Sequence, residues 1–488
     1  MKTLNSILKG VDFIGKSDDR FIENISYDSR RIKTNSLFIA ISGFKTDGHN
    51  YIEDAIESGA TAILAENINQ SQINSIPLLK VNNSRKAMSK IAANFFNNSS
   101  KKIKITGVTG TNGKTTTTQI INHILENNSK KTCALGTLGF QFQNGVKNIG
   151  FTTPESIELQ QIFQTVNNAG ISHLNMEVSS HALSLNRVAN VDIDIAVFTN
   201  LTKEHLDFHG NIDNYFNAKL KLFQNLDSNK LAIINHDDPY CFKIINETKA
   251  KVKTYGFNKE SNLYASNINM SYDGSEFLVN YQDNKSNRKK IEKVKTNLIG
   301  EFNIQNILAA ITVCKYGFNI PIKNIIKSIK SIKNIPGRFE SYKSKNKTTI
   351  IVDYAHTPDA FNKILNLVKK IDSSKKITTL FGCGGERDKT KRPLMANICE
   401  KYSDKIILTD DNPRSESSEI IFQDIISGFK KSSYEIIEDR KKAIKKAVNT
   451  LSENDILLVL GKGIENYQIF NEKKIYHNDI DIIKELIK

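Results

Sequence analysis

The sequence predicts an α/β protein of three domains. The chain has 488 residues, which exceeds the roughly 100–200 residues that one domain usually holds. Strand and helix patterns alternate over residues 103–334 and again after 337, as is typical of mostly parallel sheets. A polar segment at 97–102 and the pair Pro336-Gly337 interrupt these patterns. We therefore place the domains at 1–98, 99–334 and 335–488.

The composition indicates a cytoplasmic protein. Hydrophobic residues make up 39% of the chain and charged residues 25%, as in ordinary globular domains. No apolar run reaches the roughly 18 residues of a membrane span, and the N-terminus lacks the apolar core of a signal peptide, so we expect no membrane insertion. Five cysteines are scattered along the chain. We expect reduced thiols in the core, not disulfides or a metal site.

The net charge of +16 suggests either nucleic-acid binding or a general attraction of anionic small molecules. The lysines are spread along the chain, with no long basic block and no interleaving of basic and aromatic residues. A nucleic-acid footprint is normally clustered. We therefore expect small-molecule substrates and no nucleic-acid partner.

The N-terminal domain is predicted to be a small α/β unit. An apolar strand at 36–41, a helix around 51–58 and a second strand at 60–65 follow one another. The turns between them contain Ser, Arg and Gly, which more often shape turns than bind ligands.

The central domain begins with a glycine-rich loop at 107–116 that follows a short apolar strand. Its small residues allow successive backbone N–H groups to face phosphate oxygens, while Lys114 adds positive charge and the Thr115 hydroxyl can hold Mg²⁺. The helix that begins near Thr116 would add its dipole. The match to G-x-x-x-x-G-K-[ST] is imperfect, because Val108 occupies the first glycine position. The order of strand, loop, Lys-Thr and helix still predicts a phosphate-binding loop.

Two later segments of the central domain place polar residues at the ends of predicted strands. Glu177 lies near the end of a strand that starts at His173, where its carboxylate could hold Mg²⁺. The strand at 192–200 leads into 202–207, which contains His205. The carboxyl ends of parallel strands form the usual ligand-binding edge of open α/β sheets. Further on, Asp273-Gly274-Ser275 predicts a hairpin and so an antiparallel patch.

The C-terminal domain repeats the alternation. We expect strands at 348–353, 377–382, 405–409 and 456–461, and helices from 358, from 393, near 418 and over 441–449. Polar, Gly-rich loops follow the four strands and predict a second ligand face. The first strand is not followed by G-x-G-x-x-G, which argues against dinucleotide binding.

These motifs together resemble the Mur ligases of peptidoglycan synthesis, from one end of the chain to the other. The motifs that carry the resemblance are Gly110-Thr111-Asn112-Gly113-Lys114-Thr115, Glu177-Val178-Ser179-Ser180-His181, Asn200-Leu201-Thr202 with His205-Leu206-Asp207, Gly300-Glu301-Phe302-Asn303, Pro336-Gly337-Arg338 and Asp353-Tyr354-Ala355-His356-Thr357-Pro358. The resemblance implies an ATP-dependent amide-bond ligase that works through an acyl phosphate, in which the protein positions the reactants and neutralises phosphoryl charge.

The resemblance also implies roles for individual residues. As catalytic residues it implies Lys114, Glu177, His205 and Lys219. For ATP binding it implies Gly110, Thr111, Asn112, Gly113, Lys114, Thr115, Thr116, Asn303, Arg338 and Asp353. For Mg²⁺ it implies Thr115, Glu177, His205 and Lys219, the last in carbamylated form.

For the UDP-sugar-dipeptide substrate the resemblance implies contacts with Ser29, Phe44, Lys45, Thr46, Thr152, Thr153, Ser179 and Arg187. Two positions depart from the family pattern, namely Phe151, where Asn is often found, and Leu185, where Gln can contact substrate.

The loop Asp411-Asn412-Pro413-Arg414 resembles the branch of the family that adds meso-2,6-diaminopimelate. There the arginine grips the distal carboxylate, helped by the equivalents of Arg387, Gly461 and Glu465. A guanidinium matches a carboxylate with two parallel hydrogen bonds and would repel the distal ammonium of lysine. Three alternatives stay open: L-lysine as acceptor, glutamate as in folylpolyglutamate synthases, and a basic nucleic-acid-binding NTPase. We expect a monomer.

Overall fold

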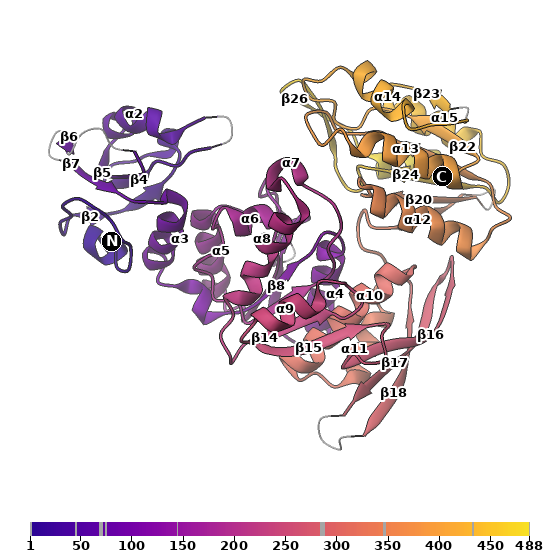
Figure 1. The fold of residues 1–488 in the computed structure, drawn as a ribbon, viewed down its shortest axis with the longest axis horizontal. Coiled ribbons are helices and arrows are strands. Elements are labelled where there is room, and N and C mark those ends of the chain that lie inside the picture. Colours follow the sequence, from indigo (N-terminus) through magenta and orange to yellow (C-terminus); the bar gives the residue numbers. More distant parts are fainter. Residues whose placement is uncertain are drawn as a thin grey trace.

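The computed structural model describes residues 2–43, 46–67, 72–73 (backbone only), 76–143, 145–283, 288–344, 348–431 and 434–487. Figure 1 shows three lobes in chain order, with the N-terminal and C-terminal lobes on either side of the central one. Each lobe has its own sheet, so the predicted three-part α/β architecture is confirmed. The predicted boundaries at 98 and 334 fall next to a 3₁₀ turn, Ser99–Lys102, and in the connection between helix α11, Ile322–Lys330, and strand β19, Glu340–Lys343.

The N-terminal lobe is built on a five-stranded sheet of order β3-β4-β5-β7-β6. The first four of these strands run parallel, and β6 pairs antiparallel with β7. Its elements are β1 Lys2–Thr3, α1 Leu4–Ile7, β2 Phe21–Ile22, β3 Asn24–Ser26, β4 Ser36–Ile39, α2 Ile52–Glu57, β5 Ala60–Ala65, β6 Gln72–Ile73, β7 Ile76–Lys80 and α3 Ser84–Phe95.

The central lobe contains an eleven-stranded sheet of order β11-β10-β9-β12-β8-β13-β14-β15-β16-β17-β18. In this spatial order the seven strands β9-β12-β8-β13-β14-β15-β16 run parallel. Antiparallel strands lie at both edges, β10 and β11 at one and β17 and β18 at the other. The hairpin predicted around Gly274 is confirmed as the turn between β16 and β17. The strands are β8 Lys104–Thr109, β9 Thr132–Gly136, β10 Gly139–Phe142, β11 Gly145–Lys147, β12 His173–Glu177, β13 Ile195–Phe198, β14 Leu231–Asn235, β15 Lys251–Gly256, β16 Leu263–Ser271, β17 Gly274–Gln282 and β18 Lys289–Thr296. The helices are α4 Lys114–Asn127, α5 Ser156–Asn168, α6 Ser180–Ser184, α7 Leu206–His209, α8 Ile212–Gln224, α9 Cys241–Glu247, α10 Glu301–Thr312 and α11 Ile322–Lys330.

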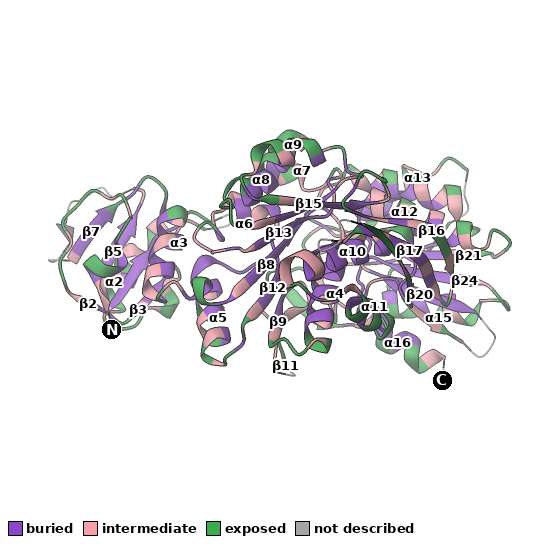
Figure 2. Ribbon diagram, turned by 90° about the horizontal axis from the view of Figure 1, so that it is seen from below, coloured by how far each residue is buried: buried purple, intermediate pink, exposed green. Residues whose placement is uncertain are grey.

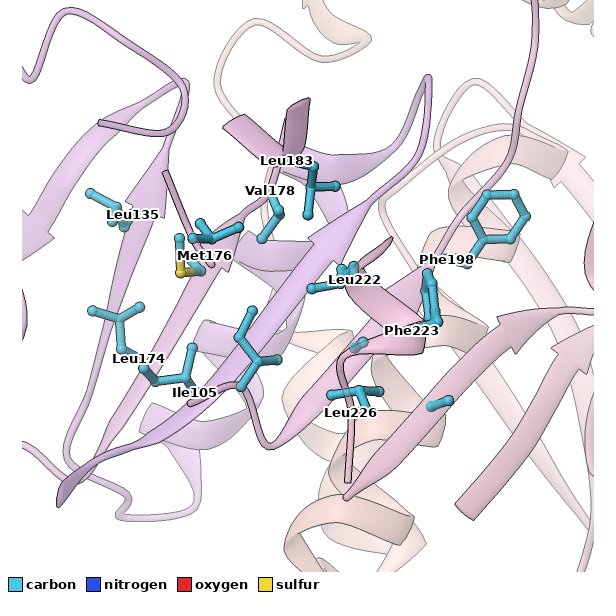
Figure 3. Close-up of a cluster of buried hydrophobic side chains, with 14 of the residues drawn as sticks. Ile105, Leu135, Leu174, Met176, Val178, Leu183, Phe198, Leu222, Phe223 and Leu226 are labelled. Carbon is cyan, nitrogen blue, oxygen red and sulfur yellow. The ribbon is translucent and has the colours of Figure 1, made fainter. Parts of the chain in front are cut away.

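The central sheet is buried on both faces, as a parallel sheet must be. Side chains alternate along each strand, so Ala196 and Phe198 of β13 join one apolar cluster while Ile195 and Val197 join the other. Figure 3 shows the first cluster, in which Phe198 lies near Phe223 of α8. In Figure 2 the buried residues concentrate on the strands and on the inner sides of the helices. This packing holds the carboxyl ends of β8, β12 and β13 side by side.

The C-terminal lobe has a six-stranded sheet of order β19-β20-β24-β21-β22-β23 in which β19 alone is antiparallel. The four predicted strands and four predicted helices are present, with ends shifted by one or two residues. The elements are β19 Glu340–Lys343, β20 Thr349–Asp353, α12 Pro358–Ile371, β21 Ile377–Phe381, α13 Lys391–Tyr402, β22 Lys405–Leu408, α14 Ser418–Ile426, β23 Tyr434–Ile436, α15 Arg440–Asn449, β24 Ile456–Leu460, β25 Tyr467–Phe470, β26 Lys473–Tyr476 and α16 Asp479–Leu486.

The five cysteines are free thiols, and each is buried, as the sequence predicts. No helix in the described ranges is both long and apolar enough to cross a membrane.

Candidate active site between the central and C-terminal lobes

A cavity of about 920 Å³ lies where the central and C-terminal lobes meet. It brings together most of the residues singled out from the sequence. Its lining includes Thr111, Asn112, Gly113, Lys114, Thr115, Thr116, Thr152, Thr153, Glu177, Ser179, Arg187, His205, Lys219, Asn303, Arg338, Asp353, Arg387, Asp411, Asn412, Arg414, Gly461 and Glu465. Phe151 and Leu185, the two departures from the family pattern, also line it.

Of the remaining six predicted site residues, the four that the structure describes are placed differently. Gly110 and Pro413 belong to lining loops but do not line the cavity themselves. Ser29 starts a 3₁₀ turn of the N-terminal lobe, and Thr46 is an exposed residue of the same lobe. Phe44 and Lys45 lie outside the described residues. The predicted contacts of this lobe with uridine diphosphate stay predictions.

The glycine-rich loop joins the end of β8 to the start of α4. Gly113 caps α4 at φ +87°, and a Cβ there would come within 2.3 Å of Asn306 Oδ1. Only glycine suits such a position without strain. The Lys114 amine donates to the carbonyls of Gly110 at 2.9 Å and Thr111 at 2.7 Å. Burial lowers the pKa of Lys114, an effect that Glu204 and Glu177 oppose.

Glu177 ends β12 with its carboxylate held in one orientation. Oε1 accepts from the Thr137 amide at 2.8 Å and Oε2 from the Thr137 hydroxyl at 3.1 Å. A Cβ at Gly136 would lie 2.2 Å from Oε1, so only glycine leaves room for this carboxylate. Each oxygen has a lone pair beyond the bond to Thr137. A fixed, buried carboxylate on the cavity wall fits a hard cation such as Mg²⁺.

His205 precedes α7 and packs in a group of aromatic rings. Its ring lies 4.8 Å from that of His181 and 6.2 Å from that of Tyr215. Burial lowers the pKa of His205 to about 4. The imidazole is therefore neutral at pH 7, which is the form that can bind a metal ion.

Lys219 of α8 is 1% exposed and faces the same loop. Its amine donates to the Gly110 carbonyl at 2.9 Å, an oxygen that also accepts from Lys114, and it lies 4.4 Å from the centre of the Tyr215 ring. Burial and the nearby charge of Lys114 lower the pKa of Lys219 well below its ordinary value. The lysine environment thus favours the neutral amine.

Of the C-terminal residues predicted to bind ATP, Arg338 contacts the glycine-rich loop and Asp353 lines the same cavity. Arg338 Nη2 donates to the Thr115 hydroxyl at 3.1 Å, and its guanidinium stacks 4.6 Å from the Tyr354 ring centre. Asp353 ends β20, and its two oxygens accept from the amides of Phe339 and Ala355, each at 2.6 Å. Burial raises the pKa of Asp353. Asn303 is fixed on the central side, where its amide donates to the Ile299 carbonyl at 2.8 Å.

On the side toward the N-terminal lobe, Arg187 is buried beside Glu155. Its Nε donates to the Glu155 carboxylate at 2.9 Å and its Nη1 to the Thr153 carbonyl at 3.0 Å. The exposed Phe151 ring lies 5.2 Å from the guanidinium carbon. Phe151 therefore contacts the predicted substrate arginine and narrows this end of the cavity.

The C-terminal wall of the cavity carries two arginines and two carboxylates. Arg414 follows β22, and its Nη1 donates at 2.7 Å to the carbonyl of Gly385, which belongs to the loop that carries Arg387. Burial and the charge of Arg387 lower the pKa of Arg414, while Asp411 and Glu465 oppose the shift. Glu465 accepts from Asn412 Nδ2 and Lys462 Nζ, both at 3.0 Å. The wall therefore offers positive and negative charge a short distance apart.

Sequence reasoning missed Glu204 and His356, which meet across the lobes. His356 Nε2 lies 3.2 Å from Glu204 Oε1. Although burial opposes ionisation, His356 and His205 hold the pKa of Glu204 well below its usual range. Both residues lie within or beside motifs named in the sequence analysis. However, a contact between residues that are 152 positions apart in the chain leaves no signal in a single sequence.

Comparisons with known proteins agree with the geometry. Three family models match: "Mur ligase family, catalytic domain" at 21–96, "Mur ligase middle domain" at 108–314 and "Mur ligase, glutamate ligase domain" at 337–463. Relatives named UDP-N-acetylmuramoyl-L-alanyl-D-glutamate–2,6-diaminopimelate ligase include one from Clostridium botulinum, 40% identical over 99% of both chains. Another, from Syntrophomonas wolfei, is 42% identical over 96% of this chain and 95% of its own. A solved structure of that ligase aligns with a TM-score of 0.70 at 29% identity, covering 100% of this chain and 99% of the other. By both sequence and architecture, the chain belongs to the Mur ligase family.

Proposed function

We propose that the chain is an ATP-dependent ligase that joins meso-2,6-diaminopimelate to UDP-N-acetylmuramoyl-L-alanyl-D-glutamate. The relatives named for this reaction, about 40% identical over nearly the whole chain, support the proposal. The observation that carries it is the single cavity whose lining includes the phosphate loop at Lys114 and the charged acceptor wall at Arg414. A ligase of this kind must bring the terminal phosphate of ATP and the amine of the acceptor into one site.

ATP would bind along the glycine-rich loop and the lobe junction. The loop amides and Lys114 would hold the β- and γ-phosphates, and Arg338, which already contacts Thr115, would add a second positive charge. Asn303 and Asp353 would contact the rest of the nucleotide. Thr115, Glu177 and His205 would hold Mg²⁺, which would neutralise phosphate charge during transfer.

The reaction would proceed in two steps. The γ-phosphoryl group of ATP moves to the D-glutamate side-chain carboxylate, giving an acyl phosphate and ADP. The amine of the acceptor then attacks the acyl carbon, and the tetrahedral intermediate expels phosphate and loses a proton to leave an amide. Lys114 and Arg338 would stabilise charge on the transferred group, and the lobes would align amine and acyl carbon.

Lys219 would act as a carbamate. A neutral amine can add to CO₂, which converts a cation into an anion, and burial favours the neutral amine here. The carbamate would be a further oxygen ligand for Mg²⁺ next to Lys114. Lys114 and Lys219 both donate to the Gly110 carbonyl, so a positive charge on both amines would be unfavourable. A carbamate on Lys219 would remove this repulsion.

The other two substrates would bind on either side of the phosphate loop. Thr152, Thr153, Ser179 and Arg187 would contact the muramoyl dipeptide, with uridine diphosphate toward the N-terminal lobe. On the acceptor wall, Arg387 and Arg414 would take the distal carboxylate of diaminopimelate, and Asp411 and Glu465 its distal ammonium. L-Lysine has the ammonium but no distal carboxylate, so it would leave both guanidinium groups unpaired.

Release of ADP tests the proposal. The purified protein is supplied with ATP, Mg²⁺ and the UDP-muramoyl dipeptide, and then with meso-diaminopimelate, L-lysine, L-glutamate or DNA. We expect release with meso-diaminopimelate and at least about tenfold lower kcat/KM with L-lysine. Equal or better turnover with lysine or glutamate would reject the acceptor, and stimulation by DNA alone would reject the ligase.

A further inference from the structure

The acceptor wall is made of two loops that interlock. The first acceptor loop, residues 382–390, follows β21 and carries Arg387, and the second, residues 409–417, follows β22 and carries Arg414. The Gly385 amide donates to the Asn412 carbonyl at 3.0 Å, and Arg414 Nη1 donates back to the Gly385 carbonyl at 2.7 Å. A Cβ at Gly385 would lie 1.9 Å from the Pro413 carbonyl oxygen. The two loops thus have almost no freedom to slide past each other.

A buried ion pair lies behind both loops. Arg392 is in the first turn of α13 and is 0% exposed. Its two terminal nitrogens donate to the two oxygens of Glu416, each at 2.8 Å, and Nη2 also donates to the Gly384 carbonyl at 3.1 Å. Nη1 donates further to Asp424 of α14 at 2.8 Å. One guanidinium therefore contacts both acceptor loops.

Glu416 makes the reciprocal bridge. It belongs to the second loop, and its Oε2 accepts from the backbone amide of Glu386 in the first loop at 3.0 Å. Glu386 precedes Arg387 and has a left-handed backbone at φ +52°, and Arg414 itself has φ +58°. Non-glycine residues keep such conformations only where their surroundings impose them. The hydrogen bond from Arg392 holds the pKa of Glu416 at about 2, so this bridge stays charged at neutral pH.

Stability alone does not explain a buried pair of this kind. Apolar residues of the same volume often give a folded protein equal or greater stability. What the pair does provide is a planar, two-point connection between loops.

We propose that Arg392 and Glu416 are positioning residues that set the separation of Arg387 and Arg414, and thereby make the enzyme require an acceptor with a distal carboxylate. This inference rests on the proposed function, because it takes the two loops as the acceptor site. Neither residue is among those assigned to the cavity, whose described lining omits both. They act only through the loops.

The matched variants are Glu416→Gln and Asp424→Asn. Each removes one carboxylate that accepts from the same Arg392 nitrogen at 2.8 Å, but only Glu416 also bonds to the first loop. For Glu416→Gln we expect the KM for meso-diaminopimelate to rise about tenfold or more, because a small displacement of binding groups is costly. The KM for ATP should stay within about twofold, and the preference for meso-diaminopimelate over L-lysine should shrink. Asp424→Asn should leave the KM for meso-diaminopimelate within about twofold, whatever it does to the melting temperature.

The outcomes distinguish failure of this inference from failure of the proposed function. An unchanged KM for meso-diaminopimelate in Glu416→Gln, or equal changes in both variants, would overturn the inference and leave the proposed function standing. A wild-type protein that releases no ADP with meso-diaminopimelate would overturn the proposed function itself. Glu416→Asp keeps the charge but shortens the bridge, and it should show the same selective rise in KM, so it replaces Glu416→Gln if that variant does not fold.

Discussion

Lys219 is a lysine whose surroundings oppose its charge. It is buried, shares its hydrogen-bond acceptor with Lys114, and has a pKa well below the ordinary value for both reasons. The sequence alone gives no such signal, because the neighbouring residues Tyr215 to Lys221 suit an ordinary amphipathic helix. The family resemblance singled it out, and the structure shows that its surroundings favour the neutral amine.

We expect Lys219 to carry a carbamate at neutral pH. Protein equilibrated with ¹³C-bicarbonate should show a carbamate carbon resonance that is missing from Lys219→Ala, because the neutral amine adds to dissolved CO₂. Lys219→Ala should also lose at least about a hundredfold in kcat. Lys221 lies on the same helix and is exposed, so Lys221→Ala is the control and should keep the resonance. A spectrum without the resonance in wild-type protein would contradict the modification.

Arg414 should matter for one substrate only. We expect Arg414→Ala to raise the KM for meso-diaminopimelate by about a hundredfold, since loss of a charge-assisted pair costs about 1.5–3 kcal/mol. The KM for ATP should change by no more than about twofold. Steady-state kinetics with each substrate varied in turn measures both. An unaltered KM for meso-diaminopimelate would remove Arg414 from the acceptor site.

Residues of the candidate site were predictable where local sequence carries the chemistry. Lys114 and Thr115 stand in a loop pattern, and Glu177 ends an apolar strand. Glu204 and Arg392 were missed because their importance comes from partners distant in the chain, namely His356 and Glu416. No spacing rule connects such pairs.

Among the elements, the start of α4 depends on glycine at two positions. The helix has no side-chain cap at its N-terminus, since Gly113 occupies that position. The turn that leads to it includes Gly110, where a Cβ would lie 1.9 Å from the Thr199 hydroxyl. Val108 itself lies in β8 and packs in the core, so the positions of the loop that need glycine are 110 and 113.

Gly113→Ala tests this constraint against Gly170→Ala. Both glycines have positive φ, +87° and +66°, but a Cβ at Gly170 would meet nothing within 4 Å. Backbone strain alone should cost Gly170→Ala about 1 kcal/mol of unfolding free energy. Gly113→Ala should cost more and should also raise the KM for ATP, because Asn306 or the loop must move. Denaturant unfolding and ATP kinetics measure the two effects, and equal losses in both variants would show that the contact with Asn306 is unimportant.

Regular elements of the C-terminal lobe were predicted to within one or two residues because β20, β21, β22 and β24 are short, largely apolar segments between polar loops. The short strands β23, β25 and β26 were not predicted. Most residues of these strands are exposed or half-buried and show no clear apolar alternation. Whether such segments form strands therefore depends on their pairing in the folded protein. One such pairing joins Arg414 to Phe470 of β25, so an unpredicted strand supports a predicted site.

For the whole molecule, the central and C-terminal lobes meet through polar contacts and an apolar patch, in which Ile299 belongs to the apolar cluster of the C-terminal lobe and Phe302 packs against it. Asn112 Nδ2 donates to Asp359 Oδ2 at 3.0 Å, and Lys343 pairs with Asp273 at 2.9 Å. Asn112 and Asp359 are 247 residues apart, so the lobe arrangement could not be read from the sequence. Domains of one chain often move relative to each other, and in the proposed reaction ATP would bind mainly on the central side of this junction and diaminopimelate on the C-terminal side.

Asp359→Ala should loosen this junction. We expect a larger radius of gyration by small-angle X-ray scattering, since a hydrogen bond worth about 1 kcal/mol is lost between lobes. Lys363→Ala is the matched control, because Lys363 bonds to the same Asp359 oxygen at 2.8 Å but within α12. Superimposable scattering curves for wild type and Asp359→Ala would contradict the role of this contact.

Global stability should fall as the pH drops from about 6.5 to 4.5. Burial lowers the pKa of His181, His205 and His209 to about 4 each. In that range the unfolded chain binds protons at these histidines and the folded chain does not, so stability decreases with falling pH. His209 faces His181, Lys219 and Asp207, and His209→Gln should make the decrease in melting temperature shallower. A melting temperature independent of pH over this range would contradict the shifts.

The buried cysteines have a practical consequence for watching the lobes move. Burial raises the pKa of Cys133 to about 12 and that of Cys241 to about 11, so the native thiols should react slowly with maleimide dyes. A fluorescent pair could then be attached through two engineered surface thiols, one on each lobe, without first removing the natural ones. Energy transfer between the dyes would report lobe closure in an otherwise unaltered protein.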